Sequence, residues 1–245
     1  MIKINQKLDH PLEHKTECLI LACVEEKKPS GTLKKFNDDF VDVISQAFEN
    51  KRFNGKPGQT LLLNSNGKAS NLLLVGIGKS KDVTAEKICQ AAGTAAKLAE
   101  QSNFKSIAAD LSAFEGIAKG KGGFYRELAC AMAEGVGLAL YHFDNYKSRD
   151  EKDDPPSRIE KLTLLTASKS RQASIEKSIA RAEKIIDAVH TARDLISHPG
   201  STATPTFLAE HAKKIARKNK ITCKVLGLSL IHISELTRRT PISYA

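Results

Sequence analysis

Residues 191–209 decide how this chain is organised, and they read Thr191-Ala-Arg-Asp-Leu-Ile-Ser-His-Pro-Gly-Ser-Thr-Ala-Thr-Pro-Thr-Phe-Leu-Ala209. Pro199 cannot continue a helix that enters this stretch, and it disfavours the α conformation in the residue before it. Thr204 followed by Pro205 is typical of a helix start, with an N-cap hydroxyl and proline in the first helical position. The stretch therefore predicts a helix–loop–helix joint, in which Arg193 and Asp194 form a structural ion pair at the end of the incoming helix.

A long amphipathic helix is predicted to run into this joint, from about residue 172 to residue 196. Its apolar stripe consists of Ile175, Ile179, Ala182, Ile186, Val189 and Ile196. At ~1.5 Å per residue, the helix spans on the order of 35 Å, which is the length of a small domain. A helix of this length can connect two domains. After the joint we expect a second helix over residues 205–219 and a strand over residues 222–226.

The residues before the long helix alternate between the patterns of strands and helices. Short apolar runs predict strands at 17–24, 60–63, 71–75, 106–111 and 161–166, and apolar stripes predict helices at 33–48, 84–102 and 124–140. Asn66-Gly67 predicts a hairpin turn between the second and third strands. Residues 116–123 and 148–157 are expected to form loops. The alternation indicates an α/β fold with a mixed sheet flanked by helices.

The joint resembles the domain junction of the leucyl aminopeptidase family, the two-zinc cytosol aminopeptidases, which usually have Asn where this chain has Ser197. Other segments resemble that family's amino-terminal domain: Gly55-Lys-Pro-Gly-Gln-Thr-Leu-Leu-Leu63, Leu73-Leu-Val-Gly-Ile-Gly-Lys79, Thr84-Ala-Glu-Lys87, Ala133-Glu-Gly135 and Tyr141-His-Phe-Asp144. The resemblance covers roughly residues 18–227. It implies a macro-domain-like amino-terminal domain at 1–168, a bridging helix at 169–198 and an incomplete start of the peptidase catalytic domain at 199–227.

Residues 228–245 do not resemble that family. Their first part, Leu228-Ser-Leu-Ile-His-Ile-Ser-Glu-Leu-Thr-Arg-Arg239, resembles the translation of a transposase-based sequencing adapter, with Leu236 where the adapter gives Pro. We therefore interpret residues 228–245 as a non-native tail and exclude them from the fold. On this interpretation Ile231 and Ile233 should lack core contacts, and His232 is no ligand candidate.

The resemblance implies an enzyme that removes amino-terminal residues, preferably bulky apolar ones, from peptides. It also implies two divalent metal ions, zinc or manganese, and a homo-hexamer in the intact enzyme. The family's catalytic and metal-binding residues lie beyond the junction, so no catalytic, cofactor-binding or metal-binding residue is carried over. We expect the chain by itself to be an inactive fragment.

The chain's own acidic residues and histidines do not suggest a metal site either. His190, His198 and His211 lack metal-ligand spacing. The pair Asp38 and Asp39 is expected on a helix face, and the pair Asp153 and Asp154 in a linker.

Two other functions stay open. A macro-domain-like fold can hold an ADP-ribose-type nucleotide near Gly76 and Gly78 and near Gly120, Gly122 and Gly123. The first glycine pair is a weak phosphate-binding signal, because Lys81 occupies the third glycine position of G-x-G-x-x-G. Plain glycines at the end of a strand are the simpler interpretation. A DNA-binding accessory role is the other alternative, since the formal net charge is +10, although the scattered lysines favour an ordinary solvated surface.

Composition limits the remaining possibilities. Hydrophobic residues make up 41% of the chain, which is enough for a packed core, but no apolar run approaches the roughly 20 residues of a membrane span. No membrane partner is expected, and the amino terminus lacks the apolar segment of a signal peptide, so we expect a cytoplasmic protein. The five cysteines show no C-x-x-C spacing and are expected to be reduced, mostly buried thiols. Cys18 and Cys23 should lie on opposite faces of one strand.

Overall fold

A computed structural model of the chain describes residues 2–28, 33–34, 43–65, 67–117, 123–147 and 158–226. Within these ranges one six-stranded sheet has the order β1-β6-β5-β2-β4-β3. Its strands are β1 Lys3–Leu8, β2 Thr16–Val24, β3 Thr60–Asn64, β4 Ala69–Gly78, β5 Ser106–Asp110 and β6 Lys161–Thr166. Neighbouring strands are parallel except for β3 and β4, which are antiparallel. The expected mixed α/β sheet is confirmed.

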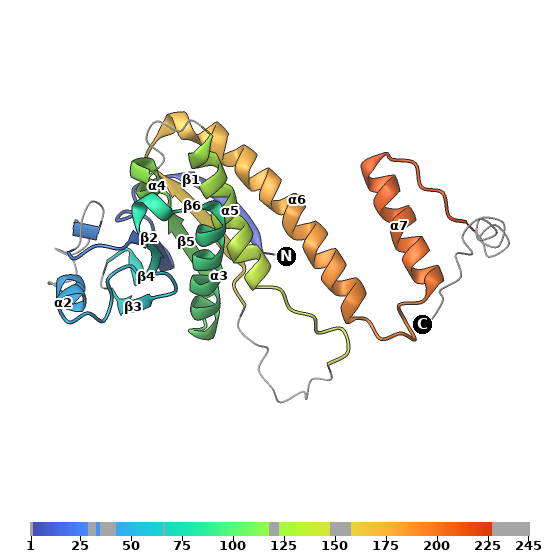
Figure 1. Ribbon diagram of the computed structural model, residues 1–245, viewed down its shortest axis with the longest axis horizontal. Coiled ribbons are helices and arrows are strands. Elements are labelled where there is room, and N and C mark those ends of the chain that lie inside the picture. The colour runs from blue at the N-terminus through green and yellow to red at the C-terminus, as the bar shows by residue number, and fades with distance from the viewer. Residues whose placement is uncertain are drawn as a thin grey trace, which may run out of the picture. The chain divides into compact units, whose positions relative to one another are not determined.

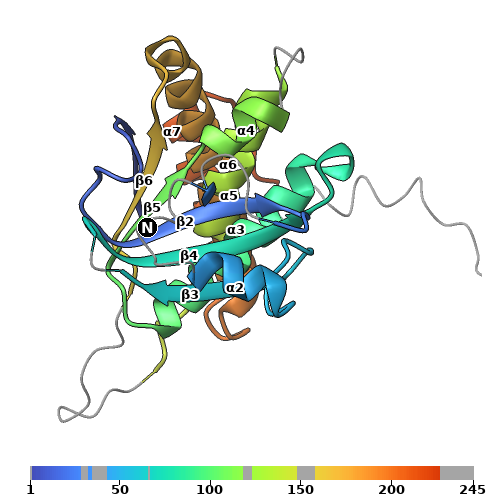
Figure 2. The same ribbon diagram turned by 90° about the vertical axis from the view of Figure 1, so that its left-hand side faces the viewer.

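Helices cover both faces of this sheet (Figures 1 and 2). The helices are α2 Val43–Glu49, α3 Ala85–Gln101, α4 Ser112–Ile117, α5 Phe124–Ala139, α6 Gln172–Ser197 and α7 Pro205–Asn219, with short 3-10 turns at Ser80–Asp82 and Lys169–Arg171. Helix α2 lies on one face, and α3 and α5 lie on the other. The chain divides into two compact units, Met1–Thr191 and Ala192–Ala245, so the boundary falls inside α6.

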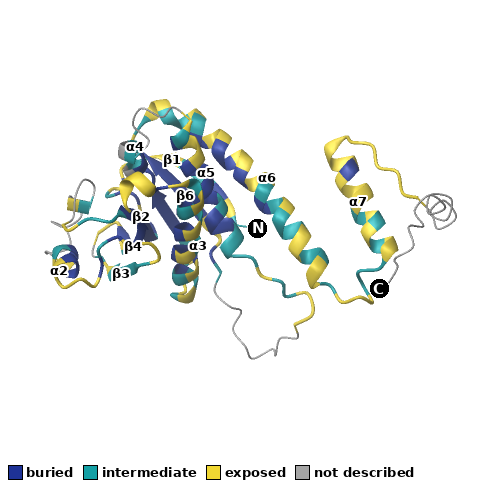
Figure 3. Ribbon diagram, viewed as in Figure 1, coloured by how far each residue is buried: buried dark blue, intermediate teal, exposed yellow. Residues whose placement is uncertain are grey.

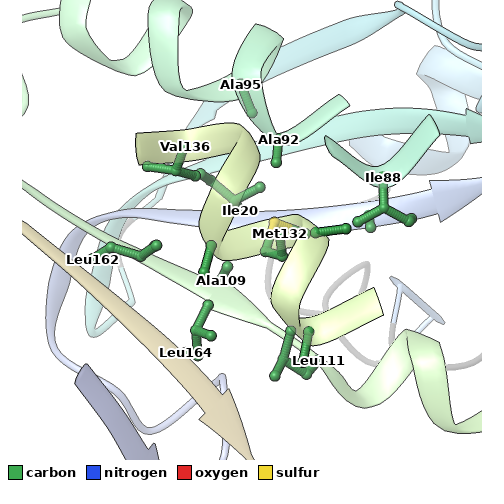
Figure 4. Packing of buried hydrophobic residues seen from close by; sticks show 14 of the residues in the cluster. Ile20, Ile88, Ala92, Ala95, Ala109, Leu111, Met132, Val136, Leu162 and Leu164 are labelled. Atoms are coloured by element: carbon green, nitrogen blue, oxygen red, sulfur yellow. The ribbon is translucent and has the colours of Figure 1, made fainter. Parts of the chain in front are cut away.

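Strand β2 lies inside the sheet, and its side chains are buried on both faces. Cys18 and Ile20 belong to the larger hydrophobic cluster, which contains α3 and α5, while Leu19 and Cys23 belong to the smaller cluster, which contains α2. The prediction that Cys18 and Cys23 lie on opposite faces is confirmed. Figure 4 shows Ile20 among side chains from β5, β6, α3 and α5 in the larger cluster.

Helices α3 and α5 pack closely because small side chains line their contact. A Cβ atom added to Gly135 of α5 would lie 2.1 Å from the carbonyl oxygen of Cys89 in α3. The α3 side of the contact is rich in buried alanines, namely Ala91, Ala92, Ala95, Ala96 and Ala99. As predicted, Thr84 caps α3, and its hydroxyl accepts a hydrogen bond from the Lys87 amide at 3.3 Å.

Of the two edge strands of the sheet, β3 was predicted from the sequence and β1 was not. The β3–β4 hairpin is confirmed, with Leu62 opposite Leu73, although Asn66 of its turn lies outside the described residues. Strand β1 was not predicted. It pairs with β6 at the other edge of the sheet, and only Ile4 of its side chains is buried, so it lacks the apolar run of an interior strand.

Two predictions need correction, and a third falls partly outside the described residues. Residues 222–226 do not form a strand; they are exposed and pair with no strand of the described chain, so their backbone lacks the hydrogen-bonding partner that a strand requires. Gly116 lies inside α4 rather than in a loop. Of the helix predicted at 33–48, the structure describes residues 33–34 and α2, in which Ile44 and Phe48 are buried; Phe36 and Phe40 lie outside the described residues.

The apolar stripe of α6 is buried in its first part only. Ile175, Ile179, Ala182 and Ile186 are buried, whereas Ile196, in the second unit, is 84% exposed. The predicted tail 228–245, with Ile231, His232 and Ile233, lies outside the described residues.

None of the described helices is both long enough and apolar enough to pass through a lipid bilayer.

Candidate functional site

The amides of the glycine pair at the end of β4, Gly76 and Gly78, are bonded to the protein's own backbone. The Gly76 amide donates to the Gln59 carbonyl at 2.8 Å, and the Gly78 amide donates to the Gly55 carbonyl at 2.9 Å. A Cβ atom on Gly76 would lie 2.0 Å from the Lys56 carbonyl oxygen, and Gly78 has a φ of +81°. The glycines thus permit close packing of residues 55–59 against the strand end, and their amides are not available to a phosphate. Gly120 and Gly122 lie outside the described residues.

The joint after α6 has the predicted helix–loop–helix form. The Thr202 and Ala203 amides donate to the Pro199 carbonyl, and the Thr204 hydroxyl accepts a hydrogen bond from the Phe207 amide at the start of α7. The rings of His198 and Phe207 are 5.3 Å apart in an edge-on arrangement. Arg193 is exposed, and Asp194 is partly buried. These contacts make the joint a structural element.

The three histidines named as poor metal ligands lie beside aromatic rings. The Nε2 atom of His190 lies 3.1 Å from the Gly137 carbonyl oxygen, and its ring lies 5.0 Å from that of Tyr141. His198 and His211 each lie beside Phe207. No group of three or more potential ligands among the described His, Cys, Asp and Glu residues can hold a metal ion. Asp38, Asp39, Asp153 and Asp154 lie outside the described residues.

The cysteines are unpaired, and three of the five are buried. Cys18, Cys23 and Cys130 are buried, Cys89 is intermediate and Cys223 is exposed. Burial raises the pKa of Cys18 to about 12, with a smaller contribution from the neighbouring Glu17 charge. Such thiols remain protonated at neutral pH and are poor nucleophiles.

The carboxyl ends of the parallel strands are the usual ligand-binding edge of an α/β sheet. Asp110 lies there, at the end of β5, and it is 2% exposed. One carboxylate oxygen accepts a hydrogen bond from the Ser112 amide and the other from the Ser112 hydroxyl, while burial raises the pKa of the group. Both oxygens therefore bond to the first residue of α4, which gives Asp110 a structural role.

A cavity of about 440 Å³, hereafter the α5–α6 cavity, lies within the first unit. It is lined by Ala85 of α3, by Arg126, Glu127, Cys130, Ala131 and Glu134 of α5, and by Lys177, Ser178 and Arg181 of α6. The Ser178 hydroxyl, at 2.9 Å from the Arg126 carbonyl oxygen, ties the two helices together. None of these residues was predicted as a site. The available signal is their spacing: Glu127 and Glu134 are two helical turns apart, and Lys177 and Arg181 are one turn apart.

The thiol of Cys130 belongs to this cavity but does not make it a nucleophilic site. The thiol donates a hydrogen bond to Glu134 Oε1 at 3.0 Å. Burial, followed by this hydrogen bond, raises the pKa of Cys130 to about 12. The thiol is therefore protonated, and the carboxylate of Glu134 supplies a negative charge to the lining.

The comparisons with known proteins agree with one another. The sequence model described as "Cytosol aminopeptidase family, N-terminal domain" matches residues 20–150. The "Probable cytosol aminopeptidase" of Geotalea uraniireducens is 33% identical over 228 residues, which cover 90% of this chain and 43% of that protein. The chain thus spans less than half the length of the curated relatives it matches.

Two solved structures extend this comparison to the fold. A mutant of the tomato leucine aminopeptidase matches with a TM-score of 0.74 and 26% identity, covering 89% of this chain and 42% of that one. The bottromycin maturation enzyme BotP, in complex with Mn, matches with a TM-score of 0.64 and 22% identity, covering 89% of this chain and 40% of its own. The likeness to BotP concerns the fold alone.

Proposed function

The chain belongs to the cytosol aminopeptidase family, and on that premise we propose that it is the amino-terminal part of a leucyl-type metallo-aminopeptidase that removes amino-terminal residues from peptides. The observation that carries the proposal is the family match over residues 20–150. The described sheet and helices, which match the tomato enzyme over 89% of this chain, support it. The nucleotide-binding alternative is disfavoured, since the amides of Gly76 and Gly78 are already bonded to residues 55–59.

We propose that the hydrolytic centre lies in the part of the relatives that this chain does not match. In such enzymes a pair of divalent ions polarises the scissile carbonyl and activates water when bound. The described residues do not fit that pair, because they contain no group of three or more potential ligands in reach of one another. We therefore derive no catalytic step from them. Manganese, which the BotP structure contains, and zinc are the ions we propose for the whole enzyme.

Within that enzyme, residues 1–168 would form the regulatory and oligomerisation domain, with residues 169–198 as the bridging helix. Residues 199–227 would begin the catalytic domain. The length of α6 and the cap of α7 by Thr204 are consistent with this division. We further propose a cytoplasmic homo-hexamer for the intact protein, which size-exclusion chromatography with light scattering of a full-length relative would test.

A second candidate function rests on the basic end of α7. Lys213, Lys214, Arg217, Lys218 and Lys220 are all exposed there, within two turns and the C-cap. Such a cluster suits contacts with the phosphates of DNA. If this role is correct, binding of a DNA duplex should weaken steeply with salt, and reversing the charge of Lys213 and Lys214 together should abolish it.

The hydrolysis proposal is tested with the purified 245-residue chain and a leucyl chromogenic substrate. With added manganese or zinc, the expected release of chromophore equals that of the metal and buffer alone. A full-length relative, assayed in parallel, should turn over the substrate and lose activity with a chelator. Chelator-sensitive, saturable turnover by this chain would overturn the proposed location of the hydrolytic centre.

A further inference from the structure

Charges of both signs surround the α5–α6 cavity. Arg126, Lys177 and Arg181 contribute three cations, and Glu127 and Glu134 contribute two carboxylates. Arg126, Glu127, Lys177 and Arg181 are exposed to solvent, and Glu134 is partly buried. The cavity is therefore accessible, and its lining can contact a ligand that carries either sign of charge.

These five charges do not neutralise one another. Among the described residues, none of the ion pairs with N···O distances up to 4.0 Å involves any of the five. The one side-chain hydrogen bond found among the five groups is the one that Glu134 accepts from the Cys130 thiol. Opposite charges thus line one cavity but stay too far apart to pair directly.

The helices that carry the charges are held in fixed positions. The Ser178 hydroxyl bonds to the Arg126 carbonyl oxygen, and a Cβ atom on Gly137 would lie 2.3 Å from the Cδ1 atom of Ile186. Along α5, Glu127 and Glu134 are separated by about 10 Å, at ~1.5 Å per residue. These contacts fix the helix backbones from which the charged side chains extend into the cavity.

A ligand that carries both an ammonium and a carboxylate group can bridge such a gap. Each of its charges would gain charge-assisted hydrogen bonds, which are stronger than those between neutral groups. A ligand with one charge would satisfy one side of the lining and leave the other unpaired. The cavity volume, about 440 Å³, lies within the range of small-molecule sites.

We propose that the α5–α6 cavity binds a small zwitterion, a free amino acid or a short peptide, with its ammonium group beside Glu134 and its carboxylate beside Arg126, Arg181 and Lys177. This inference goes beyond the proposed peptidase function and does not depend on it. No bond is made or broken at the site.

The test is isothermal titration calorimetry of the 245-residue chain with leucine and with dileucine, and with acetate and methylammonium as singly charged probes. Saturable binding of leucine supports a free amino acid as the ligand, and saturable binding of dileucine alone supports a short peptide. Acetate and methylammonium should give no saturable heat. Absence of saturable binding by both zwitterions, or equally tight binding of acetate, would overturn the proposal.

Two variants and two matched controls locate the site. Arg181→Ala and Glu134→Gln should each weaken zwitterion binding about tenfold or more, since each removes a charged hydrogen-bonding partner. The glutamine retains an oxygen that can accept the hydrogen bond from the Cys130 thiol. Lys184→Ala and Glu183→Gln change exposed residues of α6 outside the lining and should leave binding unchanged. If the two controls weaken zwitterion binding as much as the two lining variants do, and thermal melting is unchanged in all four variants, the ligand binds elsewhere.

Discussion

The two compact units differ in what covers their apolar side chains. In the first unit, Ile20 and Leu73 are fully buried between the sheet and its helices. In the described part of the second unit, Ala216 is the one buried hydrophobic residue, while Leu208 and Ile215 of α7 are exposed. Figure 3 shows exposed residues along most of α7. Thr204 caps α7, but burial of its apolar side chains requires a partner. We infer that the first unit supplies nearly all of the chain's folding free energy.

The largest contrast is expected between two isoleucine truncations. Ile20→Ala should lower the free energy of unfolding by about 2–5 kcal/mol, because it leaves a cavity in a closely packed core. Ile196→Ala, at a position that is 84% exposed, should change it by no more than about 0.5 kcal/mol. Urea unfolding followed by circular dichroism measures both. Similar losses for the two variants would break the distinction between the units.

A pair of glycine substitutions tests the same contrast through packing. Gly135→Ala places a Cβ atom 2.1 Å from the Cys89 carbonyl oxygen, so α3 and α5 must move apart. We expect a net loss of about 1–3 kcal/mol, even though alanine is the better helix former. Gly200→Ala is the control, because nothing lies within 4 Å of the added atom. If thermal unfolding shows that Gly135→Ala leaves the stability unchanged, the two helices are less closely packed than described.

Removal of the α7 cap should affect the second unit alone. Thr204→Ala deletes the hydroxyl that accepts a hydrogen bond from the Phe207 amide. The loss should destabilise the helix by about 1 kcal/mol. Amide exchange in α7 should accelerate while the urea midpoint of the first unit stays constant. A shift of that midpoint would indicate that the two units unfold together.

The smallest effect concerns the pH dependence of the first unit. Burial raises the pKa of Asp110 above its usual value, so the folded state holds this proton more tightly than the unfolded state does. Stability should therefore fall as the pH rises from the unfolded pKa through the folded pKa. Asp110→Asn removes this titrating group, so the stability of the variant should lack this fall. The stability of the variant relative to the parent should therefore increase as the pH rises over that range. A difference that does not vary with pH would contradict the assignment.

Much of the fold was predictable because its interior elements have strong local patterns. The buried run of β2, the alanine face of α3 and the Thr204-Pro205 start of α7 each carry a local signal, and each was predicted close to its observed bounds. Strand β1 was missed because an edge strand with one buried side chain has no such run. Residues 222–226 have an apolar strand pattern, but a strand also needs a neighbour, which sequence periodicity does not reveal.

The candidate cavity was not predictable for a related reason. The spacings of Glu127 and Glu134, and of Lys177 and Arg181, place each pair on one helix face. The order of residues does not say that α5 and α6 lie side by side, or that the charges remain unpaired. The contact of Gly137 with Ile186, 49 residues away in the chain, brings the two faces together.

Hydrogen exchange of the whole chain, resolved by peptide and followed by mass spectrometry, tests the central claim most directly. The account predicts that amides of β2, β4 and α5 exchange only through global unfolding, whereas amides of α7 exchange through local opening and thus many times faster. Protection of α7 equal to that of β2 would contradict it, because the second unit would then share the core of the first.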